Sequence, residues 1–209
     1  MKWIVSNQLS ALERHLHSSV DTVVFDVYGT LVRSVSNQAY RQAGALLQQA
    51  GYDKRAWYDD ALTKDDDFLA LFQYHDRQQL CTKHHLELAR LLESDLHDLS
   101  VFDELEALFR VLAEKNMRWI CCSNAARPYQ KAWGLIAATA SKVNCPIYAD
   151  PVWSFERGCK KPDTQMFDQC LHMLDSAPQR AWMVGDTFSH DISGAMRAGF
   201  AGALHLVRD

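Results

Sequence analysis

Short apolar runs alternate with amphipathic segments along the second half of the sequence, after one earlier apolar run, and this alternation most limits what the chain can fold into. An apolar run at residues 21–27 is followed by four more, at 117–122, 145–150, 180–185 and 201–207. Amphipathic segments precede or separate them at 101–115, 127–136, 163–174 and 191–199. Short, continuous apolar runs are typical of parallel strands buried on both faces. The sequence therefore predicts an α/β fold, with a parallel sheet covered by helices on both faces.

Residues 37–100 show a different pattern. No convincing strand is found there, and leucine and aromatic residues recur at helical spacings among charged residues. We therefore predict a small all-helical domain at residues 37–100, inserted into an α/β core made of residues 1–36 and 101–209. A short amphipathic helix is also expected at residues 8–17, before the first strand.

Composition places the chain among ordinary globular proteins and narrows its partners. The 209 residues are 48% hydrophobic and 23% charged, with a formal net charge of −4 and no long run of Lys or Arg. This balance argues against nucleic acid or an anionic membrane as a partner and favours a small molecule. The six cysteines show no Cys-x-x-Cys spacing, and residues 1–20 lack a signal-peptide pattern. We expect a cytoplasmic protein with reduced cysteines and no membrane-spanning segment.

Polar residues stand where the predicted strands end or where a helix is about to begin. In a parallel sheet, ligands bind beyond the carboxyl ends of the strands, so these positions are candidates for chemistry. Each one alone is an ordinary turn or cap residue. The candidates are Asp26, Ser123, Asn124, Lys161, Asp186 and Asp191.

Four separated stretches of the sequence, taken together, are far more specific than any one of these residues. The stretches "FDVYGTLV", "CCSNA", "GCKKPD" and "VGDTFSHDISGAMRAG" come in the order and with the character of the four motifs of the haloacid dehalogenase (HAD) superfamily of hydrolases. The resemblance covers nearly all of residues 20–207. It implies a Rossmann-like core with the first strand central, and a helical cap inserted after the first motif.

The resemblance also implies roles for individual residues. Asp26 would be the nucleophile that forms a covalent aspartyl intermediate. Thr30 and Ser123 would hydrogen-bond the nucleophile or the transferred group, and Lys161 would neutralise negative charge. Substrate contacts would come from Tyr28, Gly29 and Asn124, partly through backbone N–H groups of the turn. The ligands of a Mg²⁺ ion would be Asp26, the backbone carbonyl of Tyr28, Asp186, and Asp191 directly or through water.

Elementary electrostatics favours a cation at this site independently of the resemblance. Three carboxylates facing Lys161 leave a formal charge of about −2, and two unit charges 4 Å apart repel by about 4 kcal/mol at an effective dielectric of 20. An anionic substrate could not approach such a site. A hard divalent cation that bridges carboxylate and phosphate oxygens removes this obstacle, which favours a phosphohydrolase or phosphotransferase acting on a small phosphorylated molecule.

Tyr28 departs from the pattern of the superfamily's phosphatases, which carry a second aspartate two residues after the nucleophile to protonate the leaving group. A phenol with a reference pKa of about 10 is a poor substitute. "D-x-Y-G-T-L" is similar to the first motif of 2-haloacid dehalogenases, in which a halide leaves without a proton. The segment "GDTFSHD" keeps both acids of the phosphatase pattern, which argues against that activity.

Three interpretations therefore stay open from the sequence. A Mg²⁺-dependent phosphohydrolase or phosphotransferase would need a good leaving group or an acid supplied by the cap, for which His75, His84 and His85 are candidates. The alternatives are a dehalogenase and a binding protein that keeps the pocket without turnover.

Overall fold

A six-stranded, all-parallel sheet forms the centre of the molecule. The computed structural model describes residues 2–16, 19–33, 45–49, 51–76 and 82–208. The strands are β1 (Lys2–Ser6), β2 (Thr22–Phe25), β3 (Arg118–Ser123), β4 (Val152–Trp153), β5 (Ala181–Gly185) and β6 (Gly202–Leu206). They lie in the order β1-β6-β5-β2-β3-β4, and every pair is parallel. The first strand of the predicted core, β2, is central, as the sequence predicted.

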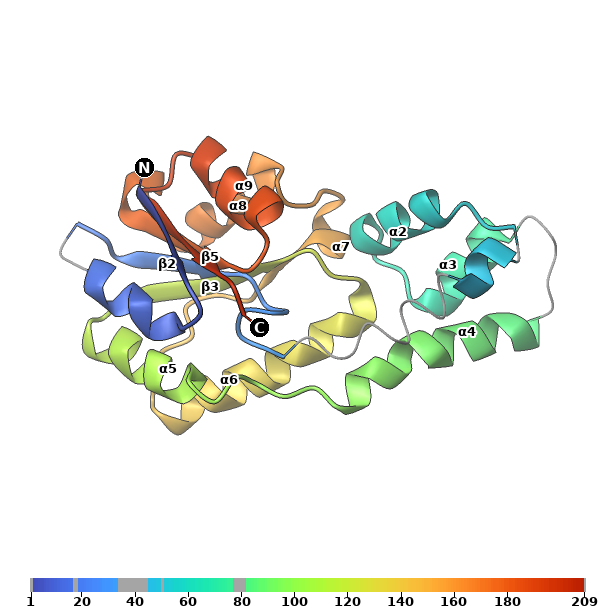
Figure 1. Ribbon diagram of the computed structural model, residues 1–209, viewed down its shortest axis with the longest axis horizontal. Helices are drawn as coiled ribbons and strands as arrows, with labels where there is room; N and C mark the ends of the chain where they lie inside the picture. The colour runs from blue at the N-terminus through green and yellow to red at the C-terminus, as the bar shows by residue number, and fades with distance from the viewer. Residues whose placement is uncertain (1, 17–18, 34–44, 50, 77–81, 209) are drawn as a thin grey trace.

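Helices cover both faces of this sheet. Figure 1 shows α8 (Thr164–Met173) and α9 (Ser193–Arg197) on one face, and α5 (Leu105–Glu114) and α6 (Ala132–Lys142) on the other. Strand β2 explains why the sequence reads as a continuous apolar run. Val23 and Phe25 pack in the cluster beneath one face, while Val24 packs in the cluster beneath the other. Because successive side chains of a strand point to opposite faces, a sheet buried on both sides needs apolar residues at every position.

Short helical segments connect the strands and the longer helices, and capping residues mark where some of these helices begin and end. Asp163 caps α8 by accepting a hydrogen bond from the backbone N–H of Gln165 at 3.0 Å. The turn α7 (Ser154–Arg157) ends at Gly158, which has a positive φ of 67°. The remaining short helices are η1 (Leu9–His15), η2 (Asp95–His97), η3 (Arg127–Lys131), η4 (Pro178–Arg180) and the π-helix η5 (Phe188–Ile192).

A second group of helices lies to one side of the sheet (Figure 1). It contains α2 (Lys54–Thr63), α3 (Phe68–His75) and α4 (Thr82–Ser94), with a helical stretch at 45–49. These helices share their own apolar cluster, in which the Trp57 ring stacks on the rings of Phe72 and Phe68 at centroid distances of 5.0 and 5.9 Å. They fit the predicted helical cap, whose exact bounds at 37–100 stay a prediction because 34–44 lie outside the described residues.

Several side-chain contacts join this group of helices and its loops to loops of the α/β part. Asp59 on α2 pairs with Lys160, and Asp65 lies 3.3 Å from the Arg127 guanidinium. The Phe68 ring packs edge-on against Tyr129 on η3, with 6.0 Å between the ring centroids. The contacted residues lie close in sequence to predicted site residues: Lys160 directly precedes Lys161, and Arg127 and Tyr129 follow Asn124 within five residues.

The structure corrects several predicted elements. The predicted strand at 145–150 is wrong: Asn144 has a left-handed conformation (φ 54°), and Pro146 has no N–H to donate to a sheet. The Pro146 carbonyl accepts a hydrogen bond from Trp119 instead. Strand β1 was not predicted, because it is an edge strand with a mostly exposed, irregular burial pattern. The predicted helix at 8–17 is the shorter 3₁₀ helix η1. No helix among the described residues is long and apolar enough to cross a membrane.

Candidate active site

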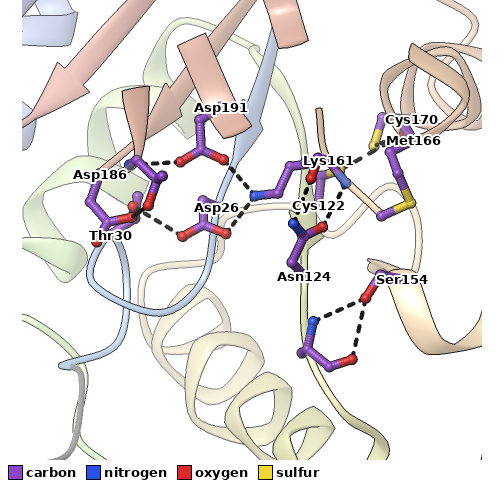
Figure 2. A network of polar contacts seen from close by, with 12 residues as sticks. Asp26, Thr30, Cys122, Asn124, Ser154, Lys161, Met166, Cys170, Asp186 and Asp191 are labelled. Atoms are coloured by element: carbon purple, nitrogen blue, oxygen red, sulfur yellow. Dashed lines mark hydrogen bonds and ion pairs between the residues drawn. The ribbon is translucent and has the colours of Figure 1, made fainter. Parts of the chain in front are cut away.

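Asp26 lies directly beyond the carboxyl end of β2, in the middle of the sheet. Its backbone N–H still donates to the Val184 carbonyl of β5 at 2.8 Å, so the strand pairing fixes where the side chain begins. Figure 2 shows its carboxylate between two partners. Oδ1 accepts from the Lys161 ammonium at 2.6 Å, and Oδ2 accepts from the Thr30 hydroxyl at 3.4 Å. The nucleophile predicted from the sequence is therefore held from two sides.

Lys161 is the buried cation of the site, with a side chain only 2% exposed. Its ammonium lies 2.6 Å from Asp26 Oδ1 and 2.6 Å from Asp191 Oδ1. Burial alone would lower the pKa of Lys161, but the carboxylates of Asp191 and Asp26 raise it above its usual range. Lys161 is thus a fixed positive charge between two acids.

Asn124 holds the backbone of Lys161 rather than its charge. The Asn124 amide nitrogen donates to the Lys161 carbonyl at 2.8 Å, and its amide oxygen accepts from the Lys161 N–H at 2.7 Å. Both ends of the amide are therefore engaged with one residue. Asn124, predicted as a substrate contact, supports the position of Lys161 in this structure, and it also lines the pocket around Asp26.

Asp186 and Asp191 follow β5, at the same edge of the sheet as Asp26. Both oxygens of Asp191 accept hydrogen bonds, Oδ1 from Lys161 and Oδ2 from the Thr187 N–H at 3.0 Å. Asp186 accepts from the Thr187 hydroxyl at 3.2 Å. One carboxylate oxygen from each of Asp26, Asp186 and Asp191 lies within 4.8 Å of the others. Hard oxygen ligands at this spacing fit a small divalent cation.

The raised pKa values of Asp26 and Asp186 show that nearby positive charge does not fully offset the burial and mutual repulsion of these carboxylates. Burial raises the pKa of Asp26 to about 6, since the opposing effect of Lys161 is smaller than that of desolvation and Asp191 adds repulsion. Burial also raises the pKa of Asp186, and the Asp26 charge raises it further. A bound cation would reverse both effects, which is a second reason why the donor set fits a metal.

Gly29 leaves the space that Asp186 occupies. It has a positive φ of 79°, and a Cβ atom built on it would lie 2.2 Å from Asp186 Oδ2. Any larger residue would therefore both strain the turn and displace the acid. Gly29 was predicted as a substrate contact, and the structure places it against the predicted metal ligand.

The pocket at these residues has a volume of about 160 Å³. Its lining residues are Asp26, Tyr28, Ser123, Asn124, Lys161, Asp186, Thr187, His190 and Asp191. Among the predicted site residues, Thr30 reaches the pocket only through Asp26, and Gly29 only through Asp186. His190 and Thr187 were not predicted. Both lie within the "GDTFSHD" segment, between the predicted ligands Asp186 and Asp191, and this position could have indicated that they line the site.

Tyr28 lines this pocket, but its hydroxyl points to another partner. It donates a hydrogen bond to the Tyr129 carbonyl oxygen at 2.5 Å, and the two rings meet edge to face with centroids 5.5 Å apart. Burial, Tyr129 and the Asp26 charge all raise the pKa of Tyr28. The phenol is therefore committed as a donor to the backbone.

The cap histidines suggested as proton donors are paired elsewhere. His75 lies 2.9 Å from Asp60 Oδ2, and His85 is buried 3.1 Å from both the Tyr52 hydroxyl and Asp76 Oδ2. Neither histidine lines the pocket around Asp26 as far as the chain is described. The side chain of His84 lies outside the described part.

Comparisons with known proteins identify the family of the chain. The sequence model of the haloacid dehalogenase-like hydrolases matches residues 20–199. A glyceraldehyde 3-phosphate phosphatase of Methanothermobacter thermautotrophicus is 37% identical over 58 residues, 28% of this chain; the match spans about a quarter (26%) of that relative.

Solved structures extend the similarity to the whole fold. A HAD phosphatase from Thermococcus onnurineus has a TM-score of 0.58 at 17% identity, covering 90% of this chain and 94% of that one. A 2-haloacid dehalogenase from Pseudomonas syringae has a TM-score of 0.56 at 17% identity, covering 88% and 85%. At this identity the two structures support the fold alone. With its motifs on one sheet edge and the family match over most of its length, the chain belongs to the haloacid dehalogenase-like hydrolases.

Proposed function

We propose that the protein is a Mg²⁺-dependent phosphohydrolase or phosphotransferase that acts on a small phosphorylated molecule. The observation that carries this proposal is the cluster of Asp26, Asp186 and Asp191 around a single buried lysine. Three acids and one ammonium leave excess negative charge at the place where a phosphate would have to bind. The matched relative that is named a phosphatase agrees with this choice.

Asp26 and Asp186 are the residues that we propose to hold the Mg²⁺ ion directly, together with the Tyr28 backbone carbonyl. Asp191, whose two oxygens accept from Lys161 and from the Thr187 N–H, would contact the ion directly or through water. When bound, Mg²⁺ would neutralise the carboxylates and the phosphate oxygens.

Asp26 performs the chemical step in this proposal. Its carboxylate oxygen attacks phosphorus, a P–O bond forms, and the bond from phosphorus to the leaving oxygen breaks. Lys161 and Thr30 hold the carboxylate in place before the attack. Water then attacks phosphorus, the P–O bond to Asp26 breaks, the Asp26 carboxylate is restored, and inorganic phosphate leaves with the protons of the water going to phosphate and solvent. In a transferase a second acceptor takes the place of water.

Proton supply decides which substrates suit this site. The Tyr28 hydroxyl donates to Tyr129 and is held there by a short hydrogen bond. We therefore propose that good substrates have a leaving group that departs without a strong acid, such as an acyl phosphate. The predicted cap, residues 37–100, would select among such substrates.

Dehalogenation has one feature in its favour, the tyrosine at position 28. Halide departure would not need the clustered acid Asp186, however, and this cluster favours phosphoryl chemistry. The similar solved structures include both a phosphatase and a dehalogenase, so they do not separate the two activities.

A substrate panel tests the proposal. We expect phosphate release from small phosphorylated compounds, acyl phosphates included, to require Mg²⁺ and to vanish in Asp26→Asn. The matched control is Asp168→Asn, which changes an exposed aspartate on α8 and should keep full activity. Turnover that persists in the presence of a chelator, or halide release from a 2-haloacid, would refute the proposal.

A further inference from the structure

We propose that Arg208 is a positioning residue for the catalytic turn, defined here as residues 26–33. Arg208 follows β6 and lies outside residues 20–199, the part that the family match covers. Its side chain returns to the loop after β2, which carries the proposed nucleophile. The inference deepens the proposed function, because it concerns the same site.

The first step is a direct contact between Arg208 and the turn. An Nη2 hydrogen of Arg208 is donated to the Thr30 carbonyl oxygen at 3.2 Å. Thr30 is fully buried, and its hydroxyl donates to Asp26 Oδ2 at 3.4 Å. A buried carbonyl needs a donor, and here the donor is a side chain 178 positions away in the sequence. Arg208 therefore reaches the nucleophile through one intervening residue.

The second step is the support of Arg208 itself. Its Nη2 donates to Glu104 Oε1 at 2.6 Å, while Glu104 Oε2 accepts the Leu9 backbone N–H at 3.0 Å. The guanidinium carbon lies 3.7 Å from the centroid of the Phe102 ring. Phe102 in turn donates its N–H to the Leu31 carbonyl at 3.0 Å. The carbonyls of Thr30 and Leu31 are thus held by one connected group.

An arginine suits this place better than a lysine. A planar guanidinium can bond a carbonyl and a carboxylate while its face stacks on an aromatic ring, whereas an ammonium is a point charge. Glu104 balances the positive charge, so the main effect of Arg208 on Asp26 is on position. A displacement of about 1 Å at a reacting group can cost about 10²-fold in rate, so small shifts of Thr30 matter.

The chain offers a matched control in Arg118. Its guanidinium pairs with Asp21 at 2.6 Å and donates to the carbonyls of Leu174 and Asp175. Its side chain is 27% exposed, against 18% for Arg208. Arg118 stands at the start of β3, so it lies at the opposite end of the strands from Asp26. Replacing either arginine removes a similar set of bonds, but only one set touches the catalytic turn.

The experiment compares Arg208→Met with Arg118→Met in the full chain, using two readouts. Amide hydrogen exchange measures how often the hydrogen bonds of the catalytic turn open, and it requires no substrate. The N–H groups of Leu31 and Val32 are suitable probes, because both donate to the Val27 carbonyl at 2.9 Å. We expect these amides to exchange about tenfold faster in Arg208→Met and at the parent rate in Arg118→Met. With a hydrolysed substrate, kcat should fall about tenfold in Arg208→Met with KM within about twofold, and Arg208→Lys should recover part of the loss.

The outcomes test the role of Arg208 separately from the proposed phosphohydrolase activity. Unchanged exchange of the turn in Arg208→Met would overturn it, and so would an equal fall of kcat in the two Met variants. Faster exchange confined to Arg208→Met supports it even if no phosphorylated substrate is hydrolysed. In that last case the proposed function fails while the structural coupling stands.

Discussion

The Tyr28 hydroxyl donates a 2.5 Å hydrogen bond to the carbonyl oxygen of Tyr129. The Tyr129 ring also contacts the rings of Tyr28 and of Phe68 on α3, so Tyr129 connects the turn after β2 to the helices of the predicted cap. This arrangement changes what substitutions at position 28 should do.

Tyr28→Phe should leave turnover nearly unchanged. The substitution keeps the ring and removes only a hydroxyl that serves the backbone, so we expect kcat within about threefold of the parent. The lost hydrogen bond should lower the free energy of unfolding by about 1 kcal/mol. Steady-state kinetics and urea unfolding measure both quantities. A fall of kcat by about 10² or more would mean that the phenol does protonate the leaving group.

Tyr28→Asp should change which substrates are used. A carboxyl group at this position can protonate an alkoxide leaving group, so hydrolysis of simple alkyl phosphates should rise by at least about tenfold. Acyl phosphates, whose leaving group is already a weak base, should gain little. Paired assays on one substrate of each kind give the ratio, and a variant that improves both equally would speak against the missing acid as the cause.

Gly29→Ala should damage the metal site as well as the backbone. An alanine there is strained by the φ of 79°, and its Cβ would meet Asp186 Oδ2 at 2.2 Å. Gly199→Ala is the matched control, since Gly199 has a φ of 80° and an added Cβ would meet Pro178 Cβ only at 3.9 Å. Both variants should lose about 1 to 2 kcal/mol of unfolding free energy. Only Gly29→Ala should lose Mg²⁺ affinity; equal affinities in the two variants would contradict this role of Gly29.

The raised pKa of Asp26 predicts a pH dependence of stability in metal-free protein. The folded state keeps this proton up to pH of about 6, while the unfolded chain releases it near its usual pKa of about 4. The folded state therefore binds more protons between these values, and stability falls as pH rises through about 6. Thermal unfolding with a chelator at pH 5 and 7.5 should show a larger fall for the parent than for Asp26→Asn. Parallel behaviour of the two proteins would rule out this contribution.

Much of the fold could be predicted because its signals are local. Val23, Val24 and Phe25 form an apolar run that is typical of a sheet buried on both faces, and the amphipathic segment at 163–174 predicts the helix α8. Strand β1 was missed although Trp3, Ile4 and Val5 also form an apolar run, because Lys2 and Ser6 bound this run closely and it lies at the exposed edge of the sheet. The short β4 is held by pairing with β3 alone, so its two residues gave no periodic pattern.

The order of the four motifs predicted the site residues. It did not predict the residues that hold them in place. Asn124 was predicted to touch substrate, whereas the structure shows both ends of its amide on Lys161. The contact of Arg208 with Thr30 joins residues 178 positions apart and leaves no trace in local sequence. Such supports depend on how the loops meet in space, which periodicity and spacing do not encode.

Calorimetric titration with Mg²⁺ tests the central claim most directly, namely that Asp26 and Asp186 together hold a divalent cation. At pH 7.5 the parent should bind one Mg²⁺, and Asp186→Asn should bind it at least about tenfold more weakly. Asp103→Asn, which alters a carboxylate 96% exposed outside the pocket, should bind like the parent. Absence of Mg²⁺ binding by the parent, with or without a phosphate mimic, or equal binding by Asp186→Asn, would contradict the account.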